Sequence, residues 1–187
     1  MKRLFVTVCL VLATLTAHAV TTSPPVPSYD IEVLVFEMRL PEYEGAELWT
    51  TDNLKPVDTA DAVVAGETPV ASELSNAATA IRSDPRFRVL LHKRWTQPAE
   101  ARSASKPVLL STGDRELDGT LRFYIARFLH LEMNLTFQPL ALVQTAFPAE
   151  SQAFQINEQR RIKTQELHYF DHPKFGAIVR VVPTGKG

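Results

Sequence analysis

Residues 120–137 read Thr-Leu-Arg-Phe-Tyr-Ile-Ala-Arg-Phe-Leu-His-Leu-Glu-Met-Asn-Leu-Thr-Phe. Every odd position except 127 carries an apolar side chain, and most even positions carry polar or aromatic ones. A period of two over this length is the pattern of a β-strand with one buried face. We therefore expect one unusually long strand whose odd residues face the core. Arg127 is the exception on the apolar face, so we expect either a bulge beside it or an ion pair with it.

The even residues of the same strand are expected to face outward. They include Tyr124, Phe128, His130 and Glu132. Exposed rings beside hydrogen-bonding groups suit a glycan, and the basic residues Arg160, Arg161 and Lys163 could pair with carboxylates of an acidic polymer. The alternative is that the rings lie under a loop and the basic residues form a solvated strand face. Both interpretations stay open at this point.

The rest of the chain predicts further strands and one helix. Strands are expected at 29–38, 87–95, 154–163 and 175–182, with a possible short edge strand at 107–111. Apolar residues point to both sides of 29–38, so that strand should be central. Thr68 and Pro69 predict the start of a helix over 69–82. This order predicts an α+β fold: a single antiparallel sheet with one main helix packed on one face and one unusually long strand.

The N-terminus predicts export. Residues 1–19 have the basic start, the apolar run and the small-x-small end of a signal peptide, and the apolar run is too short for a membrane span. Residues 20–28 form a Pro/Ser linker, and 29–187 are expected to form a single α+β domain with an acidic loop at 39–67. The one cysteine, Cys9, lies inside the signal peptide, so no disulfide or thiolate metal site is expected. A bacterial periplasm fits this pattern best.

The charge distribution argues against a nucleic-acid partner. Residues 20–67 hold ten acidic and two basic side chains, whereas 68–187 hold sixteen basic and eleven acidic ones. Nucleic-acid binding is expected to show a uniform basic surface, and this chain has none. The basic part could meet an anionic polymer, or the two parts could neutralise each other across the fold.

Residues 166–176 hold the densest group of chemically active side chains. His168 and His172 are four residues apart and Asp171 is adjacent to the second, which are the ligand types of a zinc site. A metal-dependent hydrolase built on these three residues is therefore one hypothesis. Against it, Pro173 disfavours a helix at His172, and the spacing lacks the glutamate of the common zinc motif. The alternative is a tight structural corner, which an ion pair between Arg127 and Glu166 would join to the long strand.

Four blocks together resemble the CsiV family: Tyr29–Glu37, Val89–Pro98, Arg127–Glu132 and Glu166–Gly176. The resemblance implies an exported, non-enzymatic protein without a cofactor that binds peptidoglycan. It also implies that the protein promotes cell-wall synthesis by a class A penicillin-binding protein, alongside the lipoprotein activator of that synthase. The resemblance supplies no catalytic residue and no metal site.

From side-chain chemistry we expect a ligand-binding surface with stacking rings and basic partners for carboxylates. Its candidate residues are Trp95, Tyr124, Phe128, His130, Arg160, Arg161, His168, Tyr169 and His172. A purely protein-binding module, with the loop 39–67 as its contact, is a further alternative to the hydrolase.

Overall fold

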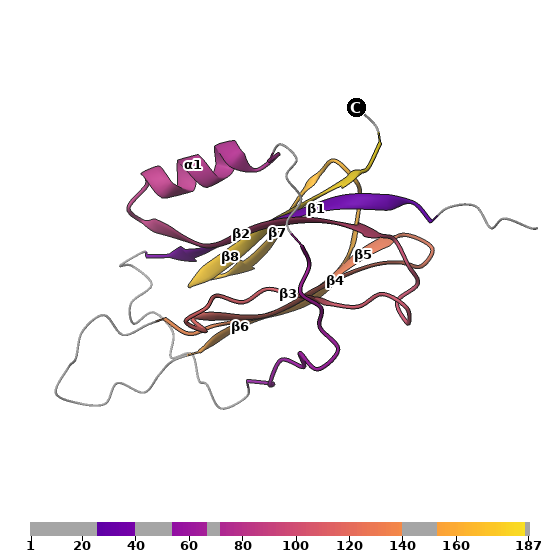
Figure 1. Ribbon diagram of the computed structural model, residues 1–187. Coiled ribbons are helices and arrows are strands. Elements are labelled where there is room, and N and C mark those ends of the chain that lie inside the picture. Colours follow the sequence, from indigo (N-terminus) through magenta and orange to yellow (C-terminus); the bar gives the residue numbers. More distant parts are fainter. Residues whose placement is uncertain (1–25, 40–53, 67–71, 140–152, 186–187) are drawn as a thin grey trace, which may run out of the picture.

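Two antiparallel four-stranded sheets pack face to face in the computed structural model, which describes residues 26–39, 54–66, 72–139 and 153–185 (Figure 1). The first sheet has the strand order β2-β1-β8-β7, and the second has the order β3-β4-β5-β6. The strands are β1 (Ser28–Met38), β2 (Phe87–Pro98), β3 (Val108–Leu109), β4 (Leu117–Ile125), β5 (Leu129–Phe137), β6 (Phe154–Ile162), β7 (Leu167–His172) and β8 (Phe175–Pro183). The expected single sheet with a main helix is wrong: the fold is mostly β, with one short helix among the described residues.

The long strand expected over 120–137 is in fact a hairpin. Strands β4 and β5 pair with Ile125 opposite Leu129, and Ala126 to Phe128 form the connection. Partners in this register are both odd or both even, so the alternation of apolar residues continues through the turn without a break. The connection contains no Gly, Pro or Asn, which are the usual turn signals. For these two reasons the pattern gave no sign of a turn.

Each sheet contributes one apolar face to the main core. Odd residues of β4 and β5 meet the odd residues of β1 and β8, including the fully buried Val33, Phe123, Leu131 and Val179. The prediction that β1 is central is confirmed, because it pairs with β2 on one side and β8 on the other. Its even residue Leu34 is also buried, on the other face of the sheet.

That other face is covered by helix α1 (Ser75–Ser83), which packs Leu74 and Ala78 against Leu34 in a second, small core (Figure 1). The helix has no side-chain cap of its own. Instead, Glu32 of β1 accepts hydrogen bonds from the backbone N–H groups of Glu73 (2.8 Å) and Leu74 (3.2 Å), in the turn that leads into the helix. The expected helix start at Thr68 and Pro69 lies outside the described residues.

The Glu32 carboxylate is 2% exposed and has two further partners. Ser72 Oγ donates to it, and His92 Nε2 lies 2.6 Å from Oε1. Burial alone would raise the pKa of Glu32, but the hydrogen bonds outweigh burial and hold the pKa below its ordinary value. The carboxylate is therefore charged, and it fixes the position of α1 on the first sheet.

The segment 166–176 forms the β7–β8 hairpin, with Pro173 and Lys174 at its turn. Strand β7 lies at the edge of the first sheet and runs next to β6, the edge of the second. Arg160 of β6 connects these two edges: its Nη1 donates to the carbonyl of Tyr169 (2.7 Å), and its guanidinium lies 4.1 Å above the ring of Phe170. We call this contact zone of β6 and β7 the seam.

Several expectations fall on residues that the structure does not describe. The signal peptide 1–19 lies entirely outside the described residues, as does most of the linker 20–28. Of the acidic loop 39–67, residues 54–66 are described and pass over the second sheet, where Val63 forms a bridge with Val108. In the described part of the chain, the helix is too short and too polar to cross a membrane.

Candidate functional site

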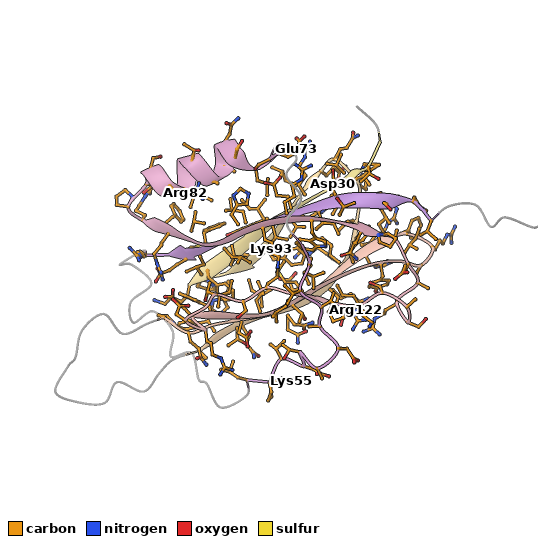
Figure 2. All side chains as sticks on the ribbon, in the orientation of Figure 1. Asp30, Lys55, Glu73, Arg82, Lys93 and Arg122 are labelled. Carbon is orange, nitrogen blue, oxygen red and sulfur yellow. The ribbon has the colours of Figure 1, made fainter. Side chains whose placement is uncertain are left out.

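A polar cleft of about 360 Å³ lies on the outer face of the second sheet, which faces away from α1. Its floor is formed by side chains of β4, β5 and β6, and one wall is formed by residues 55–61. Figure 2 shows Lys55 and Arg122 on this side of the molecule and Glu73 and Arg82 on the opposite side. The wall is held in place by Gln155 of β6, whose side chain makes two hydrogen bonds with the backbone of Lys55 (2.6 and 3.2 Å).

Charges of both signs line the cleft. Glu132 of β5 pairs with Arg102 (3.0 Å), and Arg122 Nε lies 4.0 Å from the same carboxylate oxygen. Two guanidinium groups thus share a single carboxylate, which leaves one positive charge on this side of the cleft. Asp58 and Asp61 stand on the wall across from it. The cleft can therefore attract a carboxylate at one end and a cation at the other.

Two asparagines lie directly opposite each other on the floor of the cleft. Asn134 of β5 and Asn157 of β6 are register partners. Neither side-chain amide has a hydrogen-bond partner among the described residues. Each amide offers an N–H donor pair and a carbonyl acceptor. Together they form a hydrogen-bonding surface that the fold itself does not use.

The outer face continues from the cleft to the end of the β4–β5 hairpin. His130 stacks on Tyr124 with 5.1 Å between ring centroids, and Gln159 donates to the Tyr124 hydroxyl (2.6 Å). Arg161 lies opposite His130 in the register, and its guanidinium is 3.5 Å above the ring of Phe128. Phe128 is 38% exposed, whereas Tyr124 is only 3% exposed. We call Phe128, His130 and Arg161 the hairpin end.

The expected site residues do not form one surface. Tyr124, Phe128, His130 and Arg161 come together at the hairpin end, in agreement with the outward direction expected for even positions. Trp95 is 1% exposed and lies in the main core, where its Nε1 donates to Gln97, so a ligand cannot stack on it. The rest lie at the seam or on the other sheet.

Tyr169 belongs to the outer face of the first sheet. Its ring stacks on Phe36 at 6.3 Å and its hydroxyl donates to Asp171 (2.8 Å). Burial and this hydrogen bond both raise the pKa of Tyr169, so the hydroxyl stays protonated. Tyr169 and the hairpin end therefore face different sides of the molecule.

The histidines of the expected metal site are held apart by the strand. His168 and His172 are at the start and end of β7, and four residues of a strand span about 13 Å. His168 Nε2 donates to the carbonyl of Lys163 (2.8 Å), and His172 Nδ1 accepts from the backbone N–H of Lys174 (3.1 Å). The described residues contain no group of three His, Cys, Asp or Glu side chains placed for one metal ion. These contacts are those of a structural corner.

The expected ion pair between Arg127 and Glu166 is not present. Glu166 instead pairs with Lys163 (3.4 Å), and the guanidinium of Arg127 lies 5.4 Å from the ring of Phe128 at the tip of the hairpin. Arg127 sits in the turn rather than on the apolar face of a continuous strand, so it needs no buried partner.

The cleft itself was not predicted. Arg122 and Asn134 occupy even positions of the alternating stretch, and the same parity could have pointed to both of them. Asn157 follows from the parity of the neighbouring strand. The wall at residues 55–61 has no comparable signal, because it lies far from β5 in the sequence and has no periodicity of its own.

Residues 57–184 match the model of a family described as "Peptidoglycan-binding protein, CsiV". No match was found among curated proteins or among solved structures. The matched range contains the helix, the seam, the cleft and the hairpin end, and all strands except β1. Since the match covers more than half of the sequence, this chain belongs to the CsiV family of peptidoglycan-binding proteins.

Proposed function

We propose that this protein is a non-enzymatic accessory protein of the periplasm that binds peptidoglycan through the outer face of its second sheet. The observation that carries the proposal is the continuous polar surface from the cleft to the hairpin end, with two amide side chains that have no partner among the described residues. Membership of a peptidoglycan-binding family supports the choice of ligand.

The dimensions of this surface suit a polymer. Residues 128 to 134 of β5 span about 20 Å, which is several sugar units. A second hollow of about 630 Å³ lies on the same sheet, on the other side of residues 54–57. At the hairpin end, Phe128 and His130 offer ring surface and Arg161 offers a positive charge. Sugars and carboxylates are both present in peptidoglycan.

The proposal extends to a role in cell-wall synthesis. We propose that the bound protein promotes the activity of a class A penicillin-binding protein together with its lipoprotein activator. This part is supported by the resemblance of the sequence blocks alone. It is tested by measuring glycan polymerisation by the purified synthase and its activator, with and without this protein; an unchanged rate would contradict it.

Binding is tested by sedimentation of the mature protein with purified sacculi. We expect the wild-type protein to sediment, and the variant Asn134→Ala/Asn157→Ala and the variant Arg161→Ala to remain largely in solution. Matched controls are Asn76→Ala and Arg82→Ala, which remove the same side chains from α1 on the opposite side of the molecule (Figure 2). A wild-type protein that stays in solution would contradict the proposed function.

The same assay addresses catalysis. The hydrolase hypothesis has lost its geometric basis at His168 and His172, because β7 holds the two rings apart. Incubation with sacculi should therefore release no soluble fragments. Release that depends on either histidine would contradict the non-enzymatic assignment.

A further inference from the structure

We propose that the polar cleft binds the peptide stems of peptidoglycan rather than its glycan strands, with a free carboxylate of the peptide toward Arg122 and a free amine toward Asp61. The inference rests on the proposed function and specifies which part of the polymer this cleft recognises. Peptide stems carry free carboxylates, and stems that contain a diamino acid and are not cross-linked carry a free amine as well.

The charges of the cleft match such a ligand. Its lining includes three cationic side chains, Lys55, Arg102 and Arg122, and three carboxylates, Asp58, Asp61 and Glu132. Glycan strands with attached peptides have no cationic group, so two wall carboxylates would serve no purpose toward the sugars. A ligand with both charges makes use of both sides.

Each charge has a defined place. Arg122 is held by Glu132 and by the carbonyl of Ser105, which accepts from its Nη1 at 2.5 Å. Because Arg102 shares Glu132, the pair of guanidiniums keeps one positive charge for a ligand. On the wall, Asp58 accepts from the backbone N–H of Ala60 (3.0 Å), which fixes the turn that presents Asp61. Asp61 is exposed and has no ion pair with another described residue.

Between the two charged sides lie the amides of Asn134 and Asn157. A peptide group has one N–H donor and one carbonyl acceptor, and a side-chain amide can satisfy both at once. Two such amides on adjacent strands can contact two successive groups of a chain that lies across the sheet. They also leave the fold intact when they are removed, because no described residue depends on them.

The lining of the cleft contains no aromatic residue. Flat sugar faces are commonly held by exposed rings, whose apolar surface complements the C–H groups of the sugar. The rings of this face are at the hairpin end, outside the cleft, and Tyr124 is already covered by its stacking on His130. The absence of a stacking platform separates the cleft from a sugar site.

The test uses a synthetic tetrapeptide stem that contains a diamino acid and is labelled at the end that joins the sugar. Fluorescence anisotropy is measured with the full mature protein, for the free peptide and for a version acetylated at the side-chain amine. We expect the wild-type protein to bind the free peptide, and acetylation to weaken binding about tenfold, the value of one charge-assisted hydrogen bond.

Three variants sharpen the result. In Asp61→Asn, the free and acetylated peptides should bind equally. In Asn134→Ala/Asn157→Ala, both should bind about tenfold more weakly than to the wild-type protein. Asn76→Ala on α1 should behave as wild type, and circular dichroism of all variants should match, because the substituted side chains support no other residue.

Competition separates the failure of this inference from the failure of the proposed function. If the wild-type protein sediments with sacculi and peptide-free glycan strands displace it while the tetrapeptide does not, the inference is overturned and the proposed function stands. An Asn134→Ala/Asn157→Ala variant with undiminished peptide affinity also overturns it. If the wild-type protein does not sediment at all, both are overturned.

Discussion

The outer faces of the two sheets differ in one simple property of their central strands. On the first sheet, the outward residues Leu34 and Ile178 are apolar and lie under α1. On the second sheet, the outward residues of β5 are His130, Glu132, Asn134 and Thr136, and no helix of the described chain covers them. One face is therefore closed by the fold, and the other is left for a ligand.

The polar groups on the two faces are used differently as well. On the first sheet, Glu32 has four hydrogen-bond donors around it and serves the anchoring of α1. On the second, Glu132 meets two exposed or half-exposed arginines, and the neighbouring asparagines have no partner in the described fold. A polar group that is fully satisfied by the fold is architecture, whereas one that is only partly satisfied is available for binding.

The largest effect is expected where the second sheet depends on a glycine. A Cβ at Gly119, which has φ +153°, would lie 2.1 Å from the backbone oxygen of Asn134 and 2.8 Å from Cα of Leu135. Gly119→Ala should therefore separate β4 from β5 and lower the free energy of unfolding by about 4 kcal/mol. Urea denaturation followed by circular dichroism measures this.

The first sheet supplies the comparison for that variant. A Cβ at Gly176 would lie 2.8 Å from the ring of Tyr169, a half-exposed side chain that can move. Gly176→Ala should thus cost much less, about 1 kcal/mol. Gly113→Ala, whose Cβ meets nothing within 4 Å, should leave stability unchanged. Equal losses for Gly119→Ala and Gly176→Ala would mean that the close approach of β4 to β5 is not what glycine permits.

The next largest effect should come from the anchor of α1. Glu32→Ala leaves the backbone N–H groups of Glu73 and Leu74 without their acceptor and removes the partner of His92, at a cost of about 3 kcal/mol. Glu32→Gln keeps one acceptor oxygen and should fall between this variant and the wild type. Thermal unfolding followed by the far-ultraviolet signal of the helix measures both. A Glu32→Ala protein as stable as the wild type would show that the helix is held by Leu74 and Ala78 alone.

Sequence patterns could predict the strands but not how they divide into sheets. The alternation in 120–137 correctly placed odd residues inward and even residues outward, because side-chain direction depends only on local backbone geometry. It could not reveal the turn at Ala126 to Phe128, since the register keeps the same parity across the hairpin. The error of one sheet instead of two follows directly from that missed turn.

The candidate site was predictable to a similar degree. The hairpin end follows from parity, so Phe128 and His130 were expected to face outward together. Trp95 was not expected in the core, because aromatic residues occur at binding surfaces as well as inside proteins. The wall at 55–61 depends on the contact between Lys55 and Gln155, one hundred residues apart. Local sequence cannot encode such a contact.

A smaller effect, confined to acid, is expected at the seam. His172 packs against the rings of Phe154 and Phe175, and burial lowers its pKa below the ordinary 6.5 although Asp171 opposes this shift. The unfolded chain therefore binds more protons than the folded one just below pH 6.5, so the free energy of unfolding falls as the pH is lowered through that region. His172→Asn keeps an acceptor for the backbone N–H of Lys174 and cannot titrate. Denaturation curves at pH 7.5 and 5.5 should differ less for this variant than for the wild type; an equal difference would contradict the assignment.

The smallest effect is expected at Glu132, the counterpart of Glu32 on the second sheet. The side chain of Glu132 is 21% exposed against 3% for Glu32, and its partner Arg102 is 57% exposed. Water therefore screens its ion pairs, and Glu132→Ala should cost only about 0.5 kcal/mol in the same denaturation assay in which Glu32→Ala costs several times more. Its consequence should appear in binding instead, because Arg102 and Arg122 lose the carboxylate that they share. A peptide stem with free carboxylates should bind more tightly to Glu132→Ala than to the wild type, and a version with amidated carboxylates should not. A stability loss as large as that of Glu32→Ala would mean that the outer face of the second sheet is part of the architecture and is not reserved for a ligand.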